Sequence, residues 1–583
     1  CVQKQATTRM SRKSLEERRK RRQQTLANVP LSPWDRQILS VLIALVILSS
    51  VVMVVIVSRL PTSASSNLLL HVRQRHFPAI QIVVNDTHVS YPIKNDNSKS
   101  SKIDLKVTGK LDTSNHRKLD TLRNEKTFPI MVTDDMEEIL HPGLLYAIRK
   151  NKTQHLPRQM TVPKFWDSPT YGPGGLREYL GNYGQRLITP EEAANIGSTY
   201  NGMETIYISV ASYRDPECRL TVESILARAK YPQRIRVAIM DQRAKDDPEY
   251  CSPETKCEAD PNQAYCKHLK QIDVYHVDAP LSVGPVFARH LAHRMYRGEY
   301  FAMQVDSHVR FIVNWDDDLI GQWKSAKNEM AVLTTYLSDI LGSIDPVNHT
   351  SLREGRPIMC DSDYEDEGKF RHLRHGQQPE EEPDVRGQPT LHPFWAAGFS
   401  FARGHFVTQV PYDQYLPMIF QGEEISMGLR GFTYGYDYYA PELSVCFHMY
   451  AIKENKEKRK KVKLFWENAG IYRGAEQKAM KRLNGIIAMG DPMDTYDHTD
   501  EKKYGLGKVR TTRKFFDTFG IHTETQTVED MLCSFVGKPM MQVMQPHLRP
   551  NRMGINYDEI TYKFVDPRKQ ERETEKQAMI KSI

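Results

Sequence analysis

The longest apolar run of the chain limits how its N-terminal part can fold. No ionisable residue occurs between Arg36 and Arg59, and residues 38–57 read ILSVLIALVILSSVVMVVIV. At ~1.5 Å per residue, a helix of about 20 residues crosses the ~30 Å hydrocarbon core of a bilayer. We therefore expect a transmembrane helix over 37–58. A cleaved signal peptide is the alternative, but its apolar core is usually about 7 to 15 residues long and is followed by a small-residue cleavage site.

Basic residues in front of this run predict its orientation. The first 36 residues carry ten Lys or Arg against Glu16, Glu17 and Asp35. By the positive-inside rule, the tail 1–36 is cytosolic and everything after Arg59 is luminal, which is a type II topology in a secretory membrane such as the Golgi. Much of the net charge of +8 lies in this tail, so we do not expect nucleic acid as a partner. The chain begins with Cys1, and we expect its true N-terminus to lie upstream.

Sequons and cysteines agree with a luminal body. Cys251, Cys257 and Cys266 lie in one polar segment, which predicts a loop held by a disulfide in an oxidising compartment. A zinc site is the alternative, although no CxxC pair is present. Asn-x-Thr sequons, which are weaker support, begin at Asn85, Asn151 and Asn348.

Changes in character along the chain indicate its organisation. Its 583 residues exceed one ordinary domain, and 40% hydrophobic with 26% charged residues is typical of a folded protein. We expect a polar stem over 59–198, a catalytic domain over 199–450, and a C-terminal extension over 451–583 that packs on that domain. The acidic stretch 361–384 is interpreted as a solvated loop, with a metal site as the alternative, and the charged run 453–463 as an exposed helix face, with a binding patch as the alternative.

Strand-like and helix-like patterns alternate after residue 204. Apolar β-rich runs at 205–211, 234–240, 272–277 and 300–305 are separated by helical spacing near 220–226 and 286–296, and a further helix is expected over 322–341. This alternation predicts an α/β fold with a largely parallel sheet. Asp215, Asp241 and Asp306 fall at carboxyl ends of strands, where such sheets bind ligands, so we expect a nucleotide site there.

Asp306, Ser307 and His308 give the strongest local signal. An acidic oxygen and an imidazole nitrogen two residues apart can both reach one divalent cation, and His448 is a third candidate ligand. Arg289 lies one turn into a helix opened by Gly284 and Pro285. There it is a candidate to neutralise a departing diphosphate, with a surface arginine as the alternative.

Two further segments carry candidate binding residues. Trp395, within an aromatic and glycine-containing stretch, could stack on a sugar while Gly398 allows close backbone approach; a packed core turn is equally compatible. Glu423 and Glu424 begin a helix, where one could face the donor sugar or the acceptor hydroxyl and the other could cap the helix or meet Arg430.

Taken in order, these motifs resemble the polypeptide α-N-acetylglucosaminyltransferase family. The resemblance runs from about residue 204 to 450, with fainter similarity over 504–521. It implies a GT-A-like, Rossmann-type domain for nucleotide-diphospho-sugars that uses UDP-N-acetylglucosamine and a divalent cation, most often Mn2+, with retention of configuration. The matching segments are 209–215, 284–285 with 288–289, 304–311, 395–399, 422–424 and His448.

Carried over residue by residue, the resemblance implies a set of site roles. Asp306, His308 and His448 would hold the metal, and Glu423 or Glu424 would contact the transferred sugar. We expect transfer of N-acetylglucosamine to a Ser, Thr or hydroxyproline hydroxyl of a protein; a metal-dependent hydrolase and a catalytically silent carbohydrate-binding membrane protein are the alternatives. The expected nucleotide-sugar contacts are Ala211, Tyr213, Arg214, Asp241, Arg289, Trp395 and Gly398.

Overall fold

The computed structural model describes residues 135–148, 155–167, 169–367, 370–490 and 495–581. The expected cytosolic tail (1–36), the transmembrane helix (37–58), the stem up to residue 134 and the sequons at Asn85 and Asn151 lie outside these residues. Within the described ranges, no helix combines the length and the apolar character needed to cross a bilayer.

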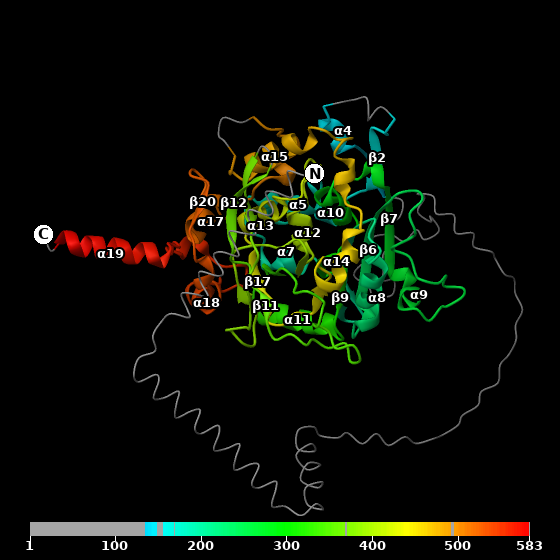
Figure 1. Cartoon of the computed structure of the whole chain (residues 1–583), viewed down its shortest axis with the longest axis horizontal. Helices are drawn as coiled ribbons and strands as arrows, with labels where there is room; N and C mark the ends of the chain where they lie inside the picture. The colour runs from blue at the N-terminus through cyan, green and yellow to red at the C-terminus, as the bar shows by residue number, and fades with distance from the viewer. Residues whose placement is uncertain (1–134, 149–154, 168, 368–369, 491–494, 582–583) are drawn as a thin grey trace, which may run out of the picture. The chain divides into compact units, whose positions relative to one another are not determined.

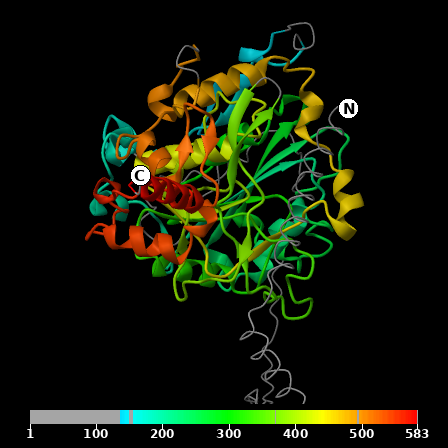
Figure 2. The ribbon, with the colours of Figure 1, turned by 60° about the vertical axis from the view of Figure 1, so that its left-hand side comes forward.

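A mixed sheet of eight strands forms the centre of the described chain, and Figure 2 shows its strands fanned out among the helices. Strands β5 to β8 are paired in parallel, as are β10 and β17, whereas β16 runs antiparallel to both β8 and β10. The α/β prediction is confirmed, but the sheet is mixed rather than largely parallel. In spatial order the strands are β15 (Thr390–Leu391), β17 (Asp437–Ala440), β10 (Ala331–Thr334), β16 (Phe399–Arg403), β8 (Phe301–Asp306), β5 (Ile206–Tyr213), β6 (Ile235–Arg243) and β7 (Ile272–Asp278).

Helices cover both faces of the parallel half. Successive side chains of a strand point to opposite faces. Ile208 of β5 belongs to one hydrophobic cluster with Val222 of α8 (Cys218–Arg228), whereas Tyr207 belongs to a second cluster with Phe287 of α10 (Pro285–Arg294). A strand buried on both faces reads as a continuous apolar run, which explains why 205–211 was recognisable in the sequence.

The expected helix over 322–341 is wrong. The helix α11 spans Trp315–Ser325, and β10 follows it as a buried sheet strand. Lys327 has a φ of 52°, in the left-handed region, which ends helical geometry between the two. The apolar residues 331–333 then pair with β16 and β17 instead of continuing a helical stripe.

The acidic stretch 361–384 is not a simple solvated loop. It contains a hairpin of β12 (Ser362–Glu367) and β13 (Phe370–His375), in which Tyr364 lies opposite Leu373 and both are buried. Cross-strand pairing offsets part of the acidic charge, since Arg374 forms an ion pair with Glu365. The many charged residues of this segment conceal, in the sequence, the alternation of buried and exposed side chains that is typical of a strand.

Part of the expected stem is folded onto the catalytic unit. Strand β1 (Met136–Leu140) pairs with β2 (Gln159–Pro163), and Leu176, Leu180 and Ile196 are buried in the same cluster as the central sheet. Folded structure therefore begins by residue 136, inside the range 59–198 that was expected to be a polar stem. The remaining helices here are α4 (Pro142–Tyr146), α5 (Gly175–Tyr179), α6 (Gly181–Gly184) and α7 (Pro190–Ala194).

The C-terminal residues pack into the same core. Phe515 and Phe519 of α17 (Thr512–Phe519) belong to the main hydrophobic cluster, and so does Met540. The disulfide Cys360–Cys533 also ties this part to the centre of the chain. Figure 1 labels helices of this region, among them α15 (Ala475–Ile486), α18 (Lys538–Met544) and α19 (Pro567–Lys581), and also α13 (Glu423–Tyr434), which precedes them in the chain.

The cysteine loop after β6 is held by two disulfides. Cys257 pairs with Cys266, as a disulfide within this loop would require, and Cys251 pairs with Cys218 at the start of α8. These bonds use all three cysteines for which zinc was the alternative. Among the described residues the remaining free cysteine is Cys446, which is buried.

Candidate active site

A turn and a strand pair bring three potential metal ligands together. Strand β8 ends at Asp306, and the chain turns through Ser307 and His308 into β9 (Val309–Phe311). Strand β18 (Cys446–His448) pairs antiparallel with β9 and places His448 opposite Val309. One ligand atom from each of Asp306, His308 and His448 therefore lies within 4.8 Å of the other two.

The protonation states of these groups suit a cation. Burial disfavours the charged form of Asp306, but the hydrogen bond from His448 and the charge of Arg289 hold the pKa of this carboxyl well below its usual range. Burial lowers the pKa of His448, so its imidazole is neutral at neutral pH. Its Nε2 lies 3.4 Å from Asp306 Oδ2. One carboxylate and two imidazoles form a donor set that fits a divalent transition-metal ion.

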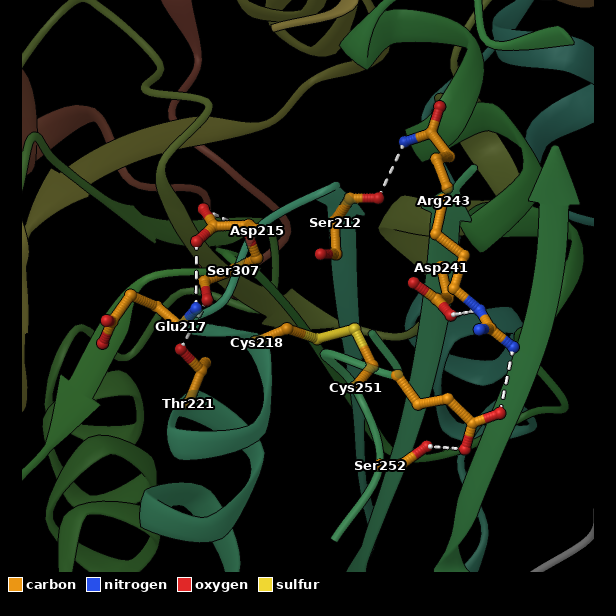
Figure 3. The surroundings of a disulfide bond; sticks show 12 residues. Ser212, Asp215, Glu217, Cys218, Thr221, Asp241, Arg243, Cys251, Ser252 and Ser307 are labelled. Atoms are coloured by element: carbon orange, nitrogen blue, oxygen red, sulfur yellow. Dashed lines mark hydrogen bonds and ion pairs between the residues drawn. A yellow bond between two sulfur atoms is a disulfide. The ribbon is translucent and has the colours of Figure 1, made fainter. Parts of the chain in front are cut away.

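A hydrogen bond to Asp215 orients the imidazole ring of His308. The Nδ1 of His308 donates to Asp215 Oδ2 at 2.8 Å, which leaves Nε2 of the same ring as the potential ligand atom. Burial favours the neutral form of Asp215, but His308 and Arg459 hold its pKa at about 2. In Figure 3, Asp215 and Ser307 lie together close to the Cys218–Cys251 disulfide, which links the start of α8 to the cysteine loop.

Arg289 is held by two carboxylates. Its Nη2 donates to Asp306 Oδ1 at 2.6 Å, and its Nη1 forms a short ion pair with Glu423 Oε1. Glu423 also accepts a hydrogen bond of 2.7 Å from the Tyr412 hydroxyl, and its side chain is 3% exposed. Glu423 therefore meets Arg289 rather than Arg430, and its carboxylate is occupied in positioning that arginine.

Glu424 lies beside the same cavity in a different environment. Its carboxyl accepts hydrogen bonds from the Tyr336 hydroxyl at 2.6 Å and from the Ala397 backbone N–H at 2.9 Å. Burial raises the pKa of Glu424 to about 7. Glu424 thus changes protonation near neutral pH.

The predicted nucleotide contacts divide into two groups. Ala211 and Tyr213, at the end of β5, line the cavity. Arg214 does not line it, because its guanidinium is bound by Asp247 at 2.7 and 2.8 Å and by Glu467 at 2.7 Å.

Asp241 is buried at the end of β6, 3.1 Å from Arg243 Nε, and does not line the cavity either. Its neighbour Gln242 does.

The aromatic and glycine-containing stretch also divides in two. Trp395 is 1% exposed and packs near Tyr412 with ring centroids 6.3 Å apart, so its ring has no free face for a sugar and the core-turn interpretation is correct. Gly398 lines the cavity, and a Cβ added there would lie 3.1 Å from Asp306 Oδ2. The absence of a side chain at Gly398 leaves room for the Asp306 carboxylate.

A cavity of about 1360 Å³ contains most of these groups. It is larger than the ~300–1,000 Å³ typical of small-ligand sites, which leaves space for a second substrate beside the first. Arg374, Gln377 and Arg459 also line it and were not foreseen. Arg374 lies in strand β13 of the hairpin, and Gln377 comes shortly after that strand. Arg459 has a buried partner, since its Nη1 lies 2.9 Å from Asp215 Oδ1, but nothing in the run 453–463 marks it as different from its exposed neighbours.

Comparison with known protein families shows to which family the chain belongs. The family model described as Glycosyltransferase (GlcNAc) matches residues 205–264 and 250–525, together more than half of the chain. The chain therefore belongs to this glycosyltransferase family. The match extends past residue 450 into the C-terminal part that packs on the sheet. No curated protein matches the chain.

Three solved structures show a loose similarity to this chain. GalNAc-T7 with UDP, GalNAc and Mn2+ is 12% identical, with 67% of this chain and 73% of that chain covered and a TM-score of 0.33. TarS 1–349 of S. aureus in complex with UDP-GlcNAc is 13% identical, with 51% of this chain and 74% of that chain covered and a TM-score of 0.26. The mannosyltransferase PcManGT from Pyrobaculum calidifontis with GDP-Man and Mn2+ is 12% identical, with 49% of this chain and 76% of that chain covered and a TM-score of 0.26. Similarity this loose says nothing about the ligands of the present chain.

Proposed function

We propose that this glycosyltransferase has a GT-A-like domain and moves N-acetylglucosamine from UDP-GlcNAc to a Ser, Thr or hydroxyproline hydroxyl of a protein, with a divalent cation and with retention of configuration. The observation that carries the proposal is the convergence of Asp306, His308 and His448 on the wall of a large cavity, in a chain of this family.

Each residue of the site has a role in this proposal. Asp306, His308 and His448 would hold the cation, which would neutralise the negative charge growing on the departing diphosphate. Asp215 orients the ring of His308 through the 2.8 Å hydrogen bond. Arg289 fixes Asp306 at 2.6 Å and adds positive charge where the diphosphate would lie.

We further propose that the chain is a type II membrane protein of the Golgi with a luminal catalytic unit. The proposal rests on the apolar run 37–58 and its basic flank. The three disulfides fit an oxidising compartment. The sequon residue Asn348 is exposed, as glycan attachment requires.

The test is transfer by the full chain, purified in detergent micelles. UDP-GlcNAc, UDP-GalNAc and UDP-glucose are each offered with Mn2+ and a Ser- and Thr-containing peptide, and the product is followed by intact mass. Addition of N-acetylhexosamine from UDP-GlcNAc alone, with an α-anomeric signal in the product's NMR spectrum, is expected. Transfer from another donor, or a β-linked product, would contradict the proposal.

The same preparation separates the two alternatives. A metal-dependent hydrolase would turn over glycoside or ester substrates without any sugar nucleotide. A silent binding protein would bind glycans yet release no UDP from any donor in the presence of peptide and Mn2+.

A further inference from the structure

One side of the cavity carries an exposed apolar surface. Phe420, Ile452, Leu464 and Trp466 all line the cavity, and each exposes between 37 and 60% of its surface. We call these four residues the apolar rim. Three of them belong to the segment 451–466, which follows the potential metal ligand His448 and places the rim beside the proposed reaction site.

Contacts between aromatic rings hold the apolar rim in place. Phe465 is 8% exposed and packs against Trp466 with ring centroids 4.1 Å apart, and Trp466 meets Phe420 edge-on at 6.5 Å. A supported aromatic ring that keeps one side open offers contact area at little cost in conformational entropy. The rim therefore has the character of a binding surface rather than of scattered exposed side chains.

The same segment is strongly basic. Residues 453–463 contain seven Lys or Arg against Glu454 and Glu457. Lys458, Arg459 and Lys460 pair with Glu217, Asp215 and Glu457, respectively.

Two of the lysines at the C-terminal end of this segment lack such pairs. Lys461 and Lys463 form no ion pair with any carboxylate of the described ranges, and Lys463 lines the cavity next to Leu464. An apolar surface with unpaired ammonium groups at its edge complements an apolar side chain flanked by carboxylates.

We propose that the apolar rim, with Lys461 and Lys463, is the acceptor-binding surface and selects an acidic polypeptide segment that presents an apolar side chain near the modified hydroxyl. The inference rests on the proposed function and adds the charge class of the acceptor. A neutral glycan would leave the ammonium groups without a partner. A flat anionic membrane is disfavoured because Lys463 and the rim line a cavity.

Three synthetic peptides test the charge preference on the full chain. They share one Thr and one Phe and differ only in the four flanking residues, which are all Asp, all Asn or all Lys. Acceptor kcat/KM is expected to fall about three- to tenfold from Asp to Asn, and further to Lys, because exposed opposite charges contribute modestly but additively. Equal values for the three peptides would overturn the proposal.

Variants locate the preference on this surface. Lys461→Glu/Lys463→Glu is expected to reverse the order of the three peptides, and Trp466→Ala to raise the KM of the Asp peptide about tenfold or more, since truncated central aromatics dominate such interfaces. The KM for UDP-GlcNAc should stay unchanged. Lys508→Glu/Lys576→Glu is the matched charge control, and Leu269→Ala, also an exposed apolar residue, is the matched truncation.

Other outcomes separate this inference from the proposed function. UDP release from UDP-GlcNAc in water without acceptor reports the donor site alone, so intact release with no peptide preference defeats the inference and leaves the function standing. A raised donor KM in Lys461→Glu/Lys463→Glu would assign the lysines to the diphosphate and overturn the proposal. The proposal would also be overturned if Lys461→Glu/Lys463→Glu no longer sedimented with phosphatidylserine vesicles while its peptide kinetics stayed unchanged, because the two lysines would then serve membrane binding.

Discussion

Replacing Asp215 with Asn tests how the site holds its metal. Asp215 is 3% exposed, and its carboxylate accepts from His308 Nδ1 at 2.8 Å and from Arg459 Nη1 at 2.9 and 3.0 Å. An amide keeps one acceptor oxygen but loses the charge and cannot serve both partners. Removing the partner that orients a ligating imidazole costs about 10- to 100-fold in metal affinity, or ~1.4 to ~2.7 kcal/mol. We expect a loss in that range for Asp215→Asn.

The assay is Mn2+ titration of the nucleotide-free full chain, with unbound Mn2+ followed by electron paramagnetic resonance. Ser307→Ala removes a 3.2 Å hydrogen bond to Asp215 and a 3.4 Å contact with His308 Nδ1 but keeps the Asp215 carboxylate, and it is expected to change the affinity by less than about threefold. Asp278→Asn, with 67% of its side chain exposed, controls for the loss of a carboxylate. Unchanged Mn2+ affinity in a folded Asp215→Asn chain would refute the orientation of His308 by Asp215.

Three further changes have defined outcomes. Gly398→Ala places a Cβ 3.1 Å from Asp306 Oδ2, so Mn2+ affinity should fall about tenfold while the thermal unfolding midpoint stays unchanged; unaltered affinity would contradict the close fit. Cys218→Ser/Cys251→Ser opens a loop with a sequence separation of 33, which should lower the free energy of chemical unfolding by about 4 kcal/mol; a loss below about 1 kcal/mol would count against this. Because burial raises the pKa of Glu424 to about 7, the folded state holds its proton longer than the unfolded chain. The stability that this group contributes is therefore complete below about pH 4.5 and is lost as pH rises through 7, by at most about 3 kcal/mol. Unfolding midpoints of Glu424→Gln should lack this decline, and parallel pH profiles for variant and wild type would contradict it.

The parallel half of the sheet was predictable because of its burial. A strand covered by helices on both faces, such as β5 between α8 and α10, leaves an uninterrupted apolar run in the sequence. The polar residues that follow such runs, Asp215 and Asp306, lie at the edge of the sheet where the cavity is found. The strands β10 and β16, which pair antiparallel with each other, are short and lie beyond Lys327, whose left-handed φ carries no sequence signal of its own.

Burial also explains where the site prediction failed. Trp395 has the composition of a sugar platform, but packing near Tyr412 puts it in the core, and no periodic pattern separates the two cases in a short loop. Arg214 has an ion-pair partner, Glu467, that lies far along the chain and that no local spacing reveals, whereas Asp241 pairs with Arg243 two residues along the same strand.

Other parts of the site could not be read from local sequence for a related reason. His448 lies far along the chain from Asp306, so no local spacing relates the two, and the β9–β18 pairing brings them together in space. Arg459 reaches Asp215 from a segment that also contains six lysines, so its role depends on tertiary packing alone.

The measurement that tests the central claim most directly is UDP release from UDP-GlcNAc by the full chain, with and without Mn2+. It compares wild type with Asp306→Asn, His448→Ala and, as the matched control, His498→Ala, which alters an imidazole with 65% of its side chain exposed. Mn2+-dependent release that persists in His498→Ala and falls by at least about a hundredfold in the two ligand variants is the predicted result. Full activity without divalent cations, or in His448→Ala, would contradict a metal-dependent transferase built on these three residues.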